Sequence, residues 1–378
     1  MFVEFTTEQK MVQKMVREFA EKEVAPLNQE MDRNGFPHKL FDKMKENGFL
    51  GIHFPEKYKG GDGDAVTSAL TIYELAKASA SVALALDAHW LAADTILVHG
   101  SEEQKQKYLS RAATDTIFAF SLTEPCAGSD AAGIQTVAEQ SGEGYVLNGT
   151  KAWCTNGGVS GVYVILAKTD KTKGAKGISA FIVEESNPGL KVGKKEDKMG
   201  MRGSQTTELI LDDCRVGRDA LLGKEGDGFK IAMMALDGAR ISIGAIGAGL
   251  SETALRVSKE YAKQRQAFGG PIANLQAIQF KIAEMAIGIE AIKLMTFDVA
   301  RMKAAGMRHT KEAAMVKVFA GAHSVQCALE AIQIHGGYGY SREYLPELLL
   351  RDAKLLQIGE GATEVLLMLI GRTELAEK

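Results

Sequence analysis

The chain has 378 residues, of which 46% are hydrophobic and 25% are charged, a composition that is ordinary for a folded globular protein. This length exceeds that of one typical core, so we expect two or three packed units. The 45 Lys and Arg residues nearly balance the 48 Asp and Glu residues, and a net charge of -3 gives no overall field that would attract nucleic acid or an anionic membrane.

The sequence carries no sign of export or membrane insertion. It has no uninterrupted run of about 18 apolar residues, so we expect no transmembrane helix. Its first ten residues contain Glu4 and Glu8 and lack the basic, apolar and small-residue order of a signal peptide. The four cysteines are scattered and form no C-x-x-C pair: Cys126, Cys154, Cys214 and Cys327. This usage favours a reducing compartment, and we expect a cytoplasmic protein.

The first hundred residues have a helical pattern. Thr6 and Gln9 have the spacing of a capping box, and Met11, Met15 and Phe19 follow on one face of the predicted helix. Further helices are predicted over residues 38–47 and 65–99, on either side of a glycine-rich turn at 60–63.

Residues 118–216 have the pattern of β-strands. Asn148 and Gly149 lie between two short apolar runs, and this pair predicts a tight hairpin because both turn positions tolerate a positive φ. Further strands are predicted over residues 162–167, 178–183 and 207–211. The charged run at 168–176 is predicted as a solvated loop.

Helical patterning returns after residue 227 in three long segments, predicted over residues 229–263, 275–305 and 311–335. The order helical, β, helical predicts an α+β fold of two helical units around a small β domain. The predicted domains are residues 1–117, 118–227 and 228–378.

Several common kinds of site are absent from the sequence. It has no G-x-x-x-x-G-K-[ST] phosphate loop and no G-x-S-x-G nucleophile elbow. The seven histidines lack the spacing of zinc ligands, so we expect no metal site. Gly244, Gly247 and Gly249 resemble a nucleotide-binding pattern only loosely, because no strand precedes them, and small residues for close helix packing are the better interpretation.

Three glycine-containing segments remain as candidate sites. The first, LTEPCAGSD at 122–130, offers backbone N–H groups and hydroxyls that suit a polar planar ligand or a phosphate, although a capped interdomain turn explains it equally well. The second, WCTNGG at 153–158, carries Trp153, which could stack on a ring system or be a half-buried core residue. The third, QIHGGYGY at 333–340, is a helix end opened by glycines, which a simple C-cap would also explain.

Together with R-x-x-F-G at 265–269 and E-G at 360–361, these segments occur in the order found in one enzyme family. The chain resembles an acyl-CoA dehydrogenase of the short-chain or butyryl-CoA type, and the resemblance covers essentially its whole length. It implies an N-terminal helical domain, a β-barrel-like middle domain and a C-terminal four-helix bundle. The segmentation made from the residues alone agrees with that order.

The resemblance implies FAD, bound between the middle and C-terminal domains. The residues that match the isoalloxazine site of the family are Phe120, Leu122, Thr123, Ser129, Trp153 and Thr155. Among these, Thr123 would hydrogen-bond the pyrimidine edge and Thr155 would lie near N5. The residues that match the pyrophosphate and adenosine site are Arg265, Gln276, Gln333, Gly336 and Gly337. In the family these contacts reach across a subunit boundary, so the resemblance implies a homotetramer built as a dimer of dimers.

The resemblance also implies the substrate site and its base. The residues that match substrate-binding positions are Ser129, Asp237, Arg240 and Gly361, and Glu360 matches the catalytic base. A carboxylate can take the α proton of a thioester if desolvation raises its pKa toward the working range. Hydrogen bonds from a flavin ribityl hydroxyl and from the backbone N–H of Glu360 would stabilise the enolate-like oxygen that develops. Without the resemblance, Glu360 would be interpreted as an exposed turn charge.

The chain departs from the family pattern on both sides of Glu360. Ala362 stands where the family commonly has Thr, which leaves Thr363 as the nearest hydroxyl for a contact to the flavin. Gly359 stands where the family often has Tyr, and the missing ring predicts tolerance of acyl groups that are bulky near Cβ, such as branched, cyclic or arylpropanoyl groups.

By the same resemblance, the helix at 74–99 would line the far end of the acyl pocket, with Asp87 as a polar contact. A neighbouring side chain, such as Tyr338 or Trp90, could instead fill the space that Gly359 leaves, because cores restore close packing. The sequence leaves these two outcomes open.

The predicted function is FAD-dependent dehydrogenation of an acyl-CoA to its trans-2-enoyl-CoA, with an electron-transfer flavoprotein as the electron partner. One alternative is the same site working as an enoyl-CoA reductase, inside an electron-bifurcating complex with that flavoprotein. An oxidase that passes electrons to oxygen is a second alternative. A catalytically silent binding protein that keeps the fold is a third, and the presence of Glu360 argues against it.

Overall fold

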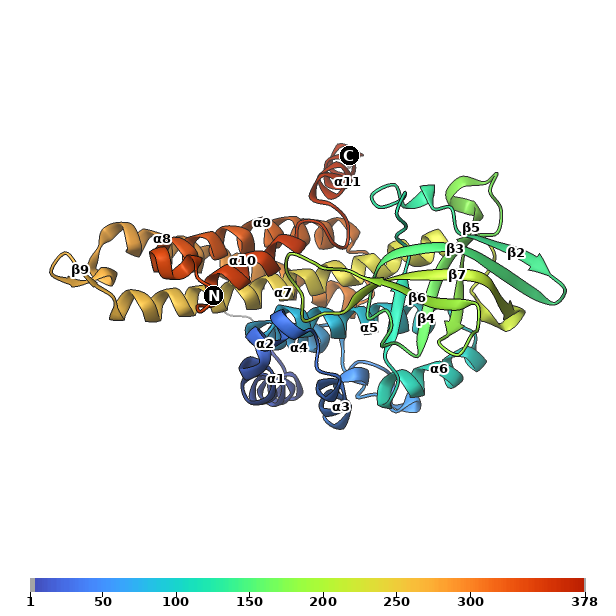
Figure 1. Ribbon diagram of the computed structural model, residues 1–378, viewed down its shortest axis with the longest axis horizontal. Coiled ribbons are helices and arrows are strands. Elements are labelled where there is room, and N and C mark those ends of the chain that lie inside the picture. The colour runs from blue at the N-terminus through green and yellow to red at the C-terminus, as the bar shows by residue number, and fades with distance from the viewer. Residues whose placement is uncertain (1–3, 377–378) are drawn as a thin grey trace.

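The computed structural model describes residues 4–376 and arranges them along one long axis (Figure 1). Helices of the C-terminal half form an elongated bundle, the β-sheet lies at one end of it, and the N-terminal helices pack along one side. The N-terminal helices are α1 (Thr7–Phe19), α2 (Asn28–Asn34), α3 (His38–Glu46), α4 (Ala65–Ala78), α5 (Ala80–His99) and α6 (Glu102–Thr114).

The first helix begins with the predicted capping box but buries a different face. Met11 and Met15 are 68% and 38% exposed, whereas Val16 and Phe19 are buried. Four residues turn an α-helix about 40° beyond one full turn, so side chains spaced only by four residues drift away from one face. Alternating steps of four and three keep Val12, Val16 and Phe19 together against the core.

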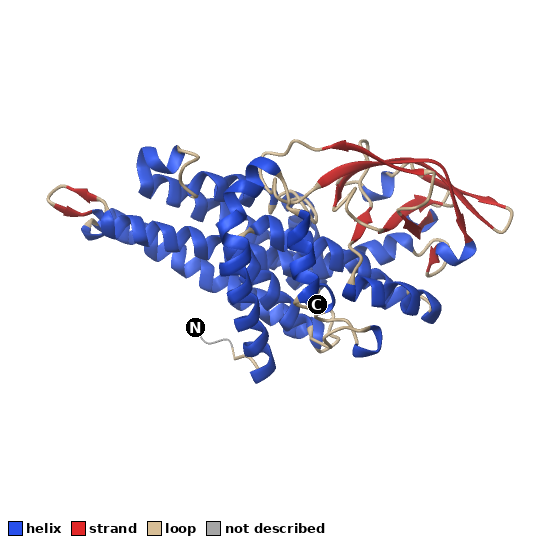
Figure 2. Cartoon of the chain, turned by 60° about the horizontal axis from the view of Figure 1, so that its bottom comes forward, coloured by secondary structure: helices blue, strands red, loops and turns tan. Residues whose placement is uncertain are grey.

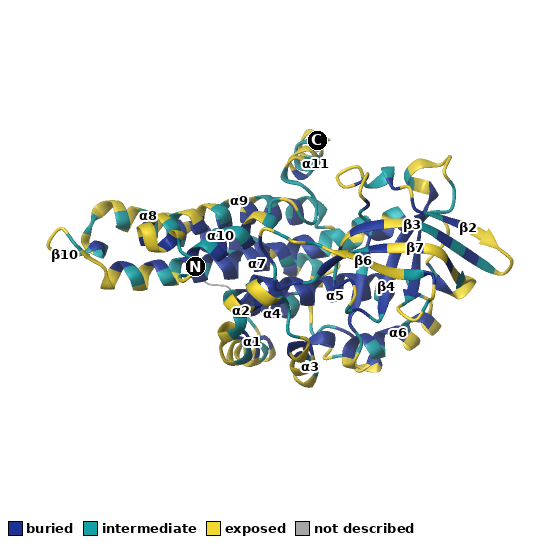
Figure 3. Ribbon diagram, in the orientation of Figure 1, coloured by how far each residue is buried: buried dark blue, intermediate teal, exposed yellow. Residues whose placement is uncertain are grey.

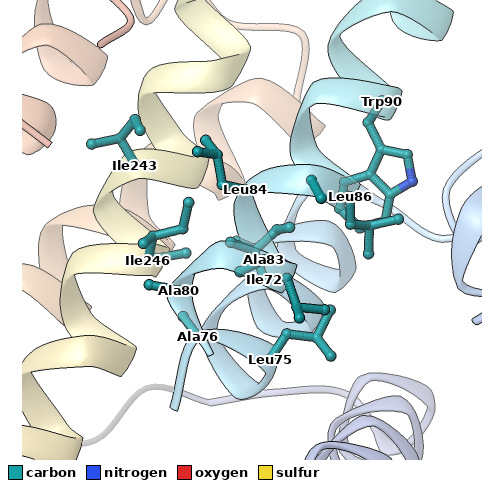
Figure 4. Close-up of a cluster of buried hydrophobic side chains, with 14 of the residues drawn as sticks. Ile72, Leu75, Ala76, Ala80, Ala83, Leu84, Leu86, Trp90, Ile243 and Ile246 are labelled. Atoms are coloured by element: carbon teal, nitrogen blue, oxygen red, sulfur yellow. The ribbon is translucent and has the colours of Figure 1, made fainter. Parts of the chain in front are cut away.

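The helical stretch predicted over residues 65–99 is two helices, because Ser79 takes an extended conformation between α4 and α5. The second of these, α5, packs against both α4 and α7 (Gly228–Gln264), which also contact each other, and Leu84 lies beside Ile243 and Ile246 in the shared core (Figure 4). Both α5 and α7 reach the length and hydropathy of membrane-spanning helices, although polar residues interrupt the apolar sequence of each. In the most apolar 18-residue stretch of each helix, 78% of the residues of α5 and 61% of those of α7 are buried within the protein, as in core helices of globular domains (Figure 3).

The strands form one eight-stranded mixed sheet in the order β6-β7-β3-β2-β4-β5-β8, and β1 pairs in parallel with β4. They are β1 (Phe118–Ser121), β2 (Val137–Ser141), β3 (Gly144–Thr155), β4 (Val162–Lys168), β5 (Ile178–Glu184), β6 (Leu190–Lys195), β7 (Thr206–Gly217) and β8 (Leu221–Leu222). On β4, Val162 and Val164 face the helical core, while Tyr163 and Ile165 face a separate core within the sheet. In the described part of the chain, β6 and β8 end the pairing path, so the sheet curves over (Figure 2) without closing into a barrel.

The hairpin predicted at Asn148 and Gly149 is wrong. Both residues lie inside the continuous strand β3, where the register against β7 shifts, and the chain reverses instead at Gly142 between β2 and β3. Gly149 has a φ of +152°, and a Cβ there would lie 2.5 Å from the hydroxyl of Thr136. The glycine therefore permits a β-bulge and the close approach of a neighbouring segment.

The C-terminal half matches its prediction to within one residue for each long helix. Its elements are α7, a short hairpin of β9 (Gln266–Ala267) and β10 (Gly270–Pro271), α8 (Gln276–Ala304), α9 (Thr310–His335), α10 (Pro346–Leu355) and α11 (Thr363–Ala376). The close-packing interpretation of the α7 glycines is confirmed: a Cβ at Gly244 would lie 2.3 Å from Val316, and one at Gly249 would lie 2.5 Å from the carbonyl oxygen of Tyr73. Helix α11 projects away from the bundle (Figure 1), and all four cysteines are free.

Candidate active site

A cavity of about 370 Å3, here called the first cavity, lies where α5, α7, the loops around β1 and β3, and the turn before α11 meet. Nine of the residues predicted to bind the flavin ring or the substrate, or to act as the base, line this cavity: Phe120, Leu122, Thr123, Ser129, Trp153, Thr155, Arg240, Glu360 and Gly361. The fold thus brings together residues that are more than two hundred positions apart in the sequence.

Glu360 lies in the turn between α10 and α11, where its backbone has a positive φ of 54°. Gly361 follows with a φ of 103°, a conformation that a side chain would strain. Burial raises the pKa of the Glu360 carboxyl above its ordinary value, and the charges of Arg240 and Lys317 oppose that shift. A carboxylate with a raised pKa on a cavity wall is suited to accept a proton near neutral pH.

Two cations hold the turn that carries Glu360. Arg240 Nε of α7 donates a hydrogen bond to the carbonyl oxygen of Glu360 at 3.3 Å, and the Lys317 ammonium of α9 donates to the carbonyl oxygen of Gly361. Lys317 is fully buried, and burial lowers its pKa to about 8. Sequence reasoning missed Lys317, although a lysine within the apolar run MVKVF is a signal that could have found it.

Two residues predicted as direct contacts, Asp237 and Thr363, are not among the residues that line the first cavity. Asp237 Oδ1 accepts from Arg240 Nη1 at 2.7 Å, and its Oδ2 accepts from the Thr310 hydroxyl at 2.6 Å, so Asp237 fixes the guanidinium that lines the cavity. The Thr363 hydroxyl donates to the carbonyl oxygen of Gln357 at 3.2 Å, which places it at the start of α11. Their contacts to substrate and flavin remain predictions.

A buried ion pair anchors the loop at 122–130 to β3. Lys151 Nζ lies 2.8 Å from Glu124 Oε1 and 3.0 Å from the carbonyl oxygen of Leu122, and both charged side chains are almost fully buried. Glu124 also accepts from the backbone N–H groups of Gln135 and Thr136. Burial alone would raise the pKa of Glu124, but Lys151 and these donors outweigh it and lower the pKa. Sequence reasoning missed this pair, whose members are 27 residues apart.

Trp153 is turned out of the sheet by its own backbone. The register of β3 against β7 shifts between Lys151 and Cys154, and Trp153 has a positive φ of 59°. Its side chain is 57% exposed at the wall of the first cavity, so the half-buried core interpretation is wrong. A bulge that redirects one aromatic side chain toward a cavity is typical of a binding site.

A second cavity, of about 560 Å3, lies near the β9–β10 hairpin. Arg265, Gln333, Gly336 and Gly337 line it, whereas Gln276 is exposed at the start of α8 and does not. Gly336 ends α9 with a positive φ of 59°, as expected of a C-cap. A Cβ at Gly336 or Gly337 would meet nothing within 4 Å, so these glycines also leave open space beside the cavity.

The residues present at the two cavities fit the two ends of a flavin dinucleotide. The first offers the Trp153 indole and the Thr123 and Thr155 hydroxyls, and a Cβ at Gly128 would project into open space there. The second offers the charge of Arg265 beside open glycine backbone, which suits a pyrophosphate. Within residues 4–376, no group of three His, Cys, Asp or Glu side chains could hold a metal ion.

The two cavities lie far apart on one chain. Arg240 of the first cavity is on α7, and Arg265 of the second directly follows that helix, so about 38 Å of helix separate them at 1.5 Å per residue. The views agree, with the β9–β10 hairpin and the sheet at opposite ends of the long axis (Figures 1 and 2).

Comparison with known proteins gives matches over the whole chain. Three family models match: acyl-CoA dehydrogenase N-terminal domain at residues 6–116, middle domain at 119–214 and C-terminal domain at 226–375. The acryloyl-CoA reductase (NADH) of Anaerotignum propionicum is 46% identical over 372 residues, which are 97% of this chain and 94% of that protein.

Two solved structures resemble the whole fold. The structure of butyryl-CoA dehydrogenase from Megasphaera elsdenii has a TM-score of 0.97 and 44% identity, with coverage of 99% of this chain and 100% of that one. A chain in a structure described as the electron transferring flavoprotein of Acidaminococcus fermentans, from work on flavin-based electron bifurcation, has a TM-score of 0.98 and 44% identity, with full coverage of both chains.

Proposed function

This chain belongs to the acyl-CoA dehydrogenase family, and we propose that Glu360 is the base with which it interconverts a saturated acyl-CoA and its trans-2-enoyl-CoA. The protein is a FAD-dependent oxidoreductase that acts on CH–CH bonds. The observation that carries the proposal is the place of Glu360. Its carboxyl has a raised pKa and lies on the wall of a cavity that also presents Trp153 and Thr155.

When bound, FAD supplies the acceptor for the β hydrogen, which leaves as a hydride. Glu360 accepts the α proton, and the substrate that fills the cavity excludes water and keeps the pKa of this carboxyl high. The backbone N–H of Glu360 donates to the thioester carbonyl as negative charge develops on its oxygen. Arg240 and Lys317, by holding the carbonyl groups of the turn, keep this N–H and the carboxyl in place.

The remaining residues divide between cofactor and substrate. We assign the flavin ring to Phe120, Leu122, Thr123, Ser129, Trp153 and Thr155, all of which line the first cavity. We assign the substrate to Ser129, Arg240 and Gly361, with Asp237 acting through Arg240. The ion pair of Glu124 and Lys151 holds the loop of Thr123 and Ser129 against β3.

The distance between the cavities supports an assembly in which each FAD spans two subunits. We infer that the two ends of a single FAD bind to different chains, because most of α7 separates Arg240 at the first cavity from Arg265 at the second. Large apolar side chains are also exposed along α8 and α9, at Phe280, Ile287, Phe319 and Leu329. Such surfaces are usual at interfaces between copies of a chain. We therefore propose that copies of this chain associate through these helices. From the resemblance and the sequence pattern we further propose a cytoplasmic homotetramer built as a dimer of dimers, with the domains of each chain at 1–117, 118–227 and 228–378.

Replacing Arg265 by Ala is expected to weaken FAD retention by about tenfold or more and to shift the assembly toward smaller species. The loss of one charge-assisted contact to a phosphate accounts for that factor, and a cofactor that spans an interface stabilises the assembled form. Gel filtration with measurement of bound FAD tests this. The control is Arg256→Ala, which removes an exposed cation that pairs with Glu260 on α7, the helix that Arg265 follows. A stable monomer with full FAD occupancy would contradict the proposal.

The direction of the reaction has two candidates. The similarity to an acryloyl-CoA reductase and to a chain from work on electron bifurcation supports an enoyl-CoA reductase in a complex with an electron-transfer flavoprotein. The similarity to butyryl-CoA dehydrogenase supports the oxidative direction with the same partner. Copurification with an electron-transfer flavoprotein and NADH-driven reduction of an enoyl-CoA would establish the reductase. Peroxide release during turnover would indicate an oxidase instead.

Gly359 is not among the residues that line the first cavity, so the resemblance alone carries the expectation that the acyl pocket accepts groups bulky near Cβ in the space that a Tyr before the base would occupy. The two side chains that could have filled it are held elsewhere. Trp90 is buried with its indole N–H donating to the carbonyl oxygen of Leu50 at 2.8 Å, and Tyr338 lines the second cavity. A Cβ at Gly359 would make only ordinary contacts with Leu355 at 3.7 Å, so a larger residue fits the backbone.

The test compares kcat/KM for butyryl-CoA and 3-phenylpropanoyl-CoA in the wild type and in Gly359→Tyr. We expect the Tyr ring to lower the phenylpropanoyl to butyryl ratio by about tenfold or more, because it occupies the space that the aryl group needs. A wild type that strongly prefers butyryl-CoA, with the same ratio in the variant, would contradict the wide pocket.

A further inference from the structure

One carboxyl group interrupts the apolar wall of the first cavity. The α5 residues that line the cavity are Leu84, Asp87, Ala88 and Leu91, and those of α7 are Phe229, Met233, Leu236 and Arg240. Within these two sets of described residues, Asp87 is the one acid, and only 4% of its surface is exposed. A carboxyl placed among leucine, alanine and aromatic side chains is costly unless it meets a polar partner.

The protein itself does not supply a full partner for Asp87. In the described residues 4–376, no Lys, Arg or His nitrogen forms a salt bridge with it, and Ser242 is the one hydrogen-bonding side chain that acts on it. Burial raises the pKa of Asp87 to about 8, and the nearby charges of Glu360 and Asp94 add to this, whereas Lys303 opposes it. The group can therefore both donate and accept a hydrogen bond toward the cavity at neutral pH.

The second aspartate of the same helix shows what a purely structural acid looks like here. Asp94 lies two turns further along α5, pairs with His53 Nε2 at 2.7 Å and has Lys303 within 3.8 Å. These partners hold the pKa of Asp94 below its ordinary value although burial acts against them. Asp87 has no comparable set of partners in the protein. A ligand in the cavity that hydrogen-bonds its carboxyl would supply the missing partner.

We propose that Asp87 binds a hydroxyl group on the acyl chain, so that the preferred substrate is a hydroxylated acyl-CoA rather than a plain hydrocarbon one. A hydroxyl donates to Asp87 when the carboxyl is ionised and can also accept from its O–H when it is protonated, so a hydroxyl pairs with either proton state. A ligand carboxylate at this position would meet the negative charge of Glu360 in the same cavity, and a ligand ammonium would lose its hydration against Leu84 and Leu91. This inference rests on the proposed acyl-CoA reaction and names the substrate class for that site.

The test uses two pairs of substrates: 3-phenylpropanoyl-CoA with 3-(4-hydroxyphenyl)propanoyl-CoA, in which a hydroxyl replaces a hydrogen, and hexanoyl-CoA with 5-hydroxypentanoyl-CoA, in which a hydroxyl replaces the terminal methyl group. The FAD-loaded wild type, Asp87→Leu and Asp87→Asn are compared by kcat/KM for each member. We expect the wild type to prefer the hydroxylated member of at least one pair by about tenfold or more, because a buried polar group is left unpaired by the other member. The pair that shows the preference identifies the alcohol as phenolic or aliphatic.

Asp87→Leu is expected to reverse that preference, and Asp87→Asn to keep most of it, because an amide still offers a donor and an acceptor. The ratio within a pair does not depend on how much of a variant folds, so a purely structural role for Asp87 would leave it unchanged. Equal loss of both members in Asp87→Leu, or a wild-type preference for the apolar member of both pairs, would overturn the inference. Reduction of the wild-type flavin by butyryl-CoA or by any member of the two pairs shows that the proposed reaction occurs, and no reduction by any of these compounds would contradict both proposals.

Discussion

Glu360→Gln is expected to lower the rate of flavin reduction by acyl-CoA by about a thousandfold or more while FAD and acyl-CoA still bind. The amide keeps the shape of the side chain and cannot accept the α proton, and general bases contribute about 10²–10⁴ to such rates. Anaerobic rapid mixing measures the reduction, and the shift of the flavin spectrum on adding substrate measures binding. Near-normal reduction in the variant would remove Glu360 from the role of base.

The pH dependence of flavin reduction in the wild type is a second, independent test of Glu360 as the base. Burial raises the pKa of Glu360, with Arg240 and Lys317 opposing it, so the acid limb of the reduction rate lies above the ordinary Glu value of about 4.3. The base acts in its deprotonated form, so the rate rises with pH through that limb and levels off above it. The limb should be missing from the residual rate of Glu360→Gln.

Lys151→Met is expected to destabilise the protein by about 3–5 kcal/mol, because it leaves the buried carboxylate of Glu124 without its cation. The same change loosens the loop that carries Thr123 and Ser129, so FAD retention should fall with stability. The double variant Glu124→Gln with Lys151→Met should recover part of the loss, since no charge then stays buried and unpaired. Denaturant unfolding of the FAD-loaded protein, followed by flavin release, measures both effects.

The matched control for this prediction lies on the same sheet. Lys191 pairs with Asp212 at 2.9 Å, close to the 2.8 Å of the buried pair, but its side chains are 57% and 65% exposed. Lys191→Met should therefore cost less than about 1 kcal/mol, as exposed pairs usually do. Equal effects of Lys151→Met and Lys191→Met would show that burial of the pair is not what stabilises the loop.

Features that depend on neighbours in the sequence could be predicted from it. The three long C-terminal helices follow from sustained helical periodicity, and the glycines of α7 were correctly interpreted as packing residues because no strand precedes them. The motif residues of both cavities were found through the resemblance, and all but Gln276, Asp237 and Thr363 line a cavity.

Features set by distant partners could not be predicted. Asn148 and Gly149 carry the same local signal in a hairpin turn and in a β-bulge, and only the contact of Gly149 with Thr136 decides between them. Lys151 meets Glu124 through strand pairing, and Lys317 meets the turn of Glu360 through the bundle. Each of these contacts joins segments whose approach no local pattern encodes.

Anaerobic titration of the FAD-loaded protein with a panel of acyl-CoAs tests the central claim most directly. The panel contains butyryl-CoA, 3-phenylpropanoyl-CoA and 3-(4-hydroxyphenyl)propanoyl-CoA, and both wild type and Glu360→Gln are titrated. We predict that the wild-type flavin is bleached by at least one of them, with formation of the matching trans-2-enoyl-CoA, and that the variant binds the same compound without bleaching. A wild-type flavin that binds these compounds and stays oxidised with all of them, or a variant that bleaches as fast as the wild type, would contradict the account.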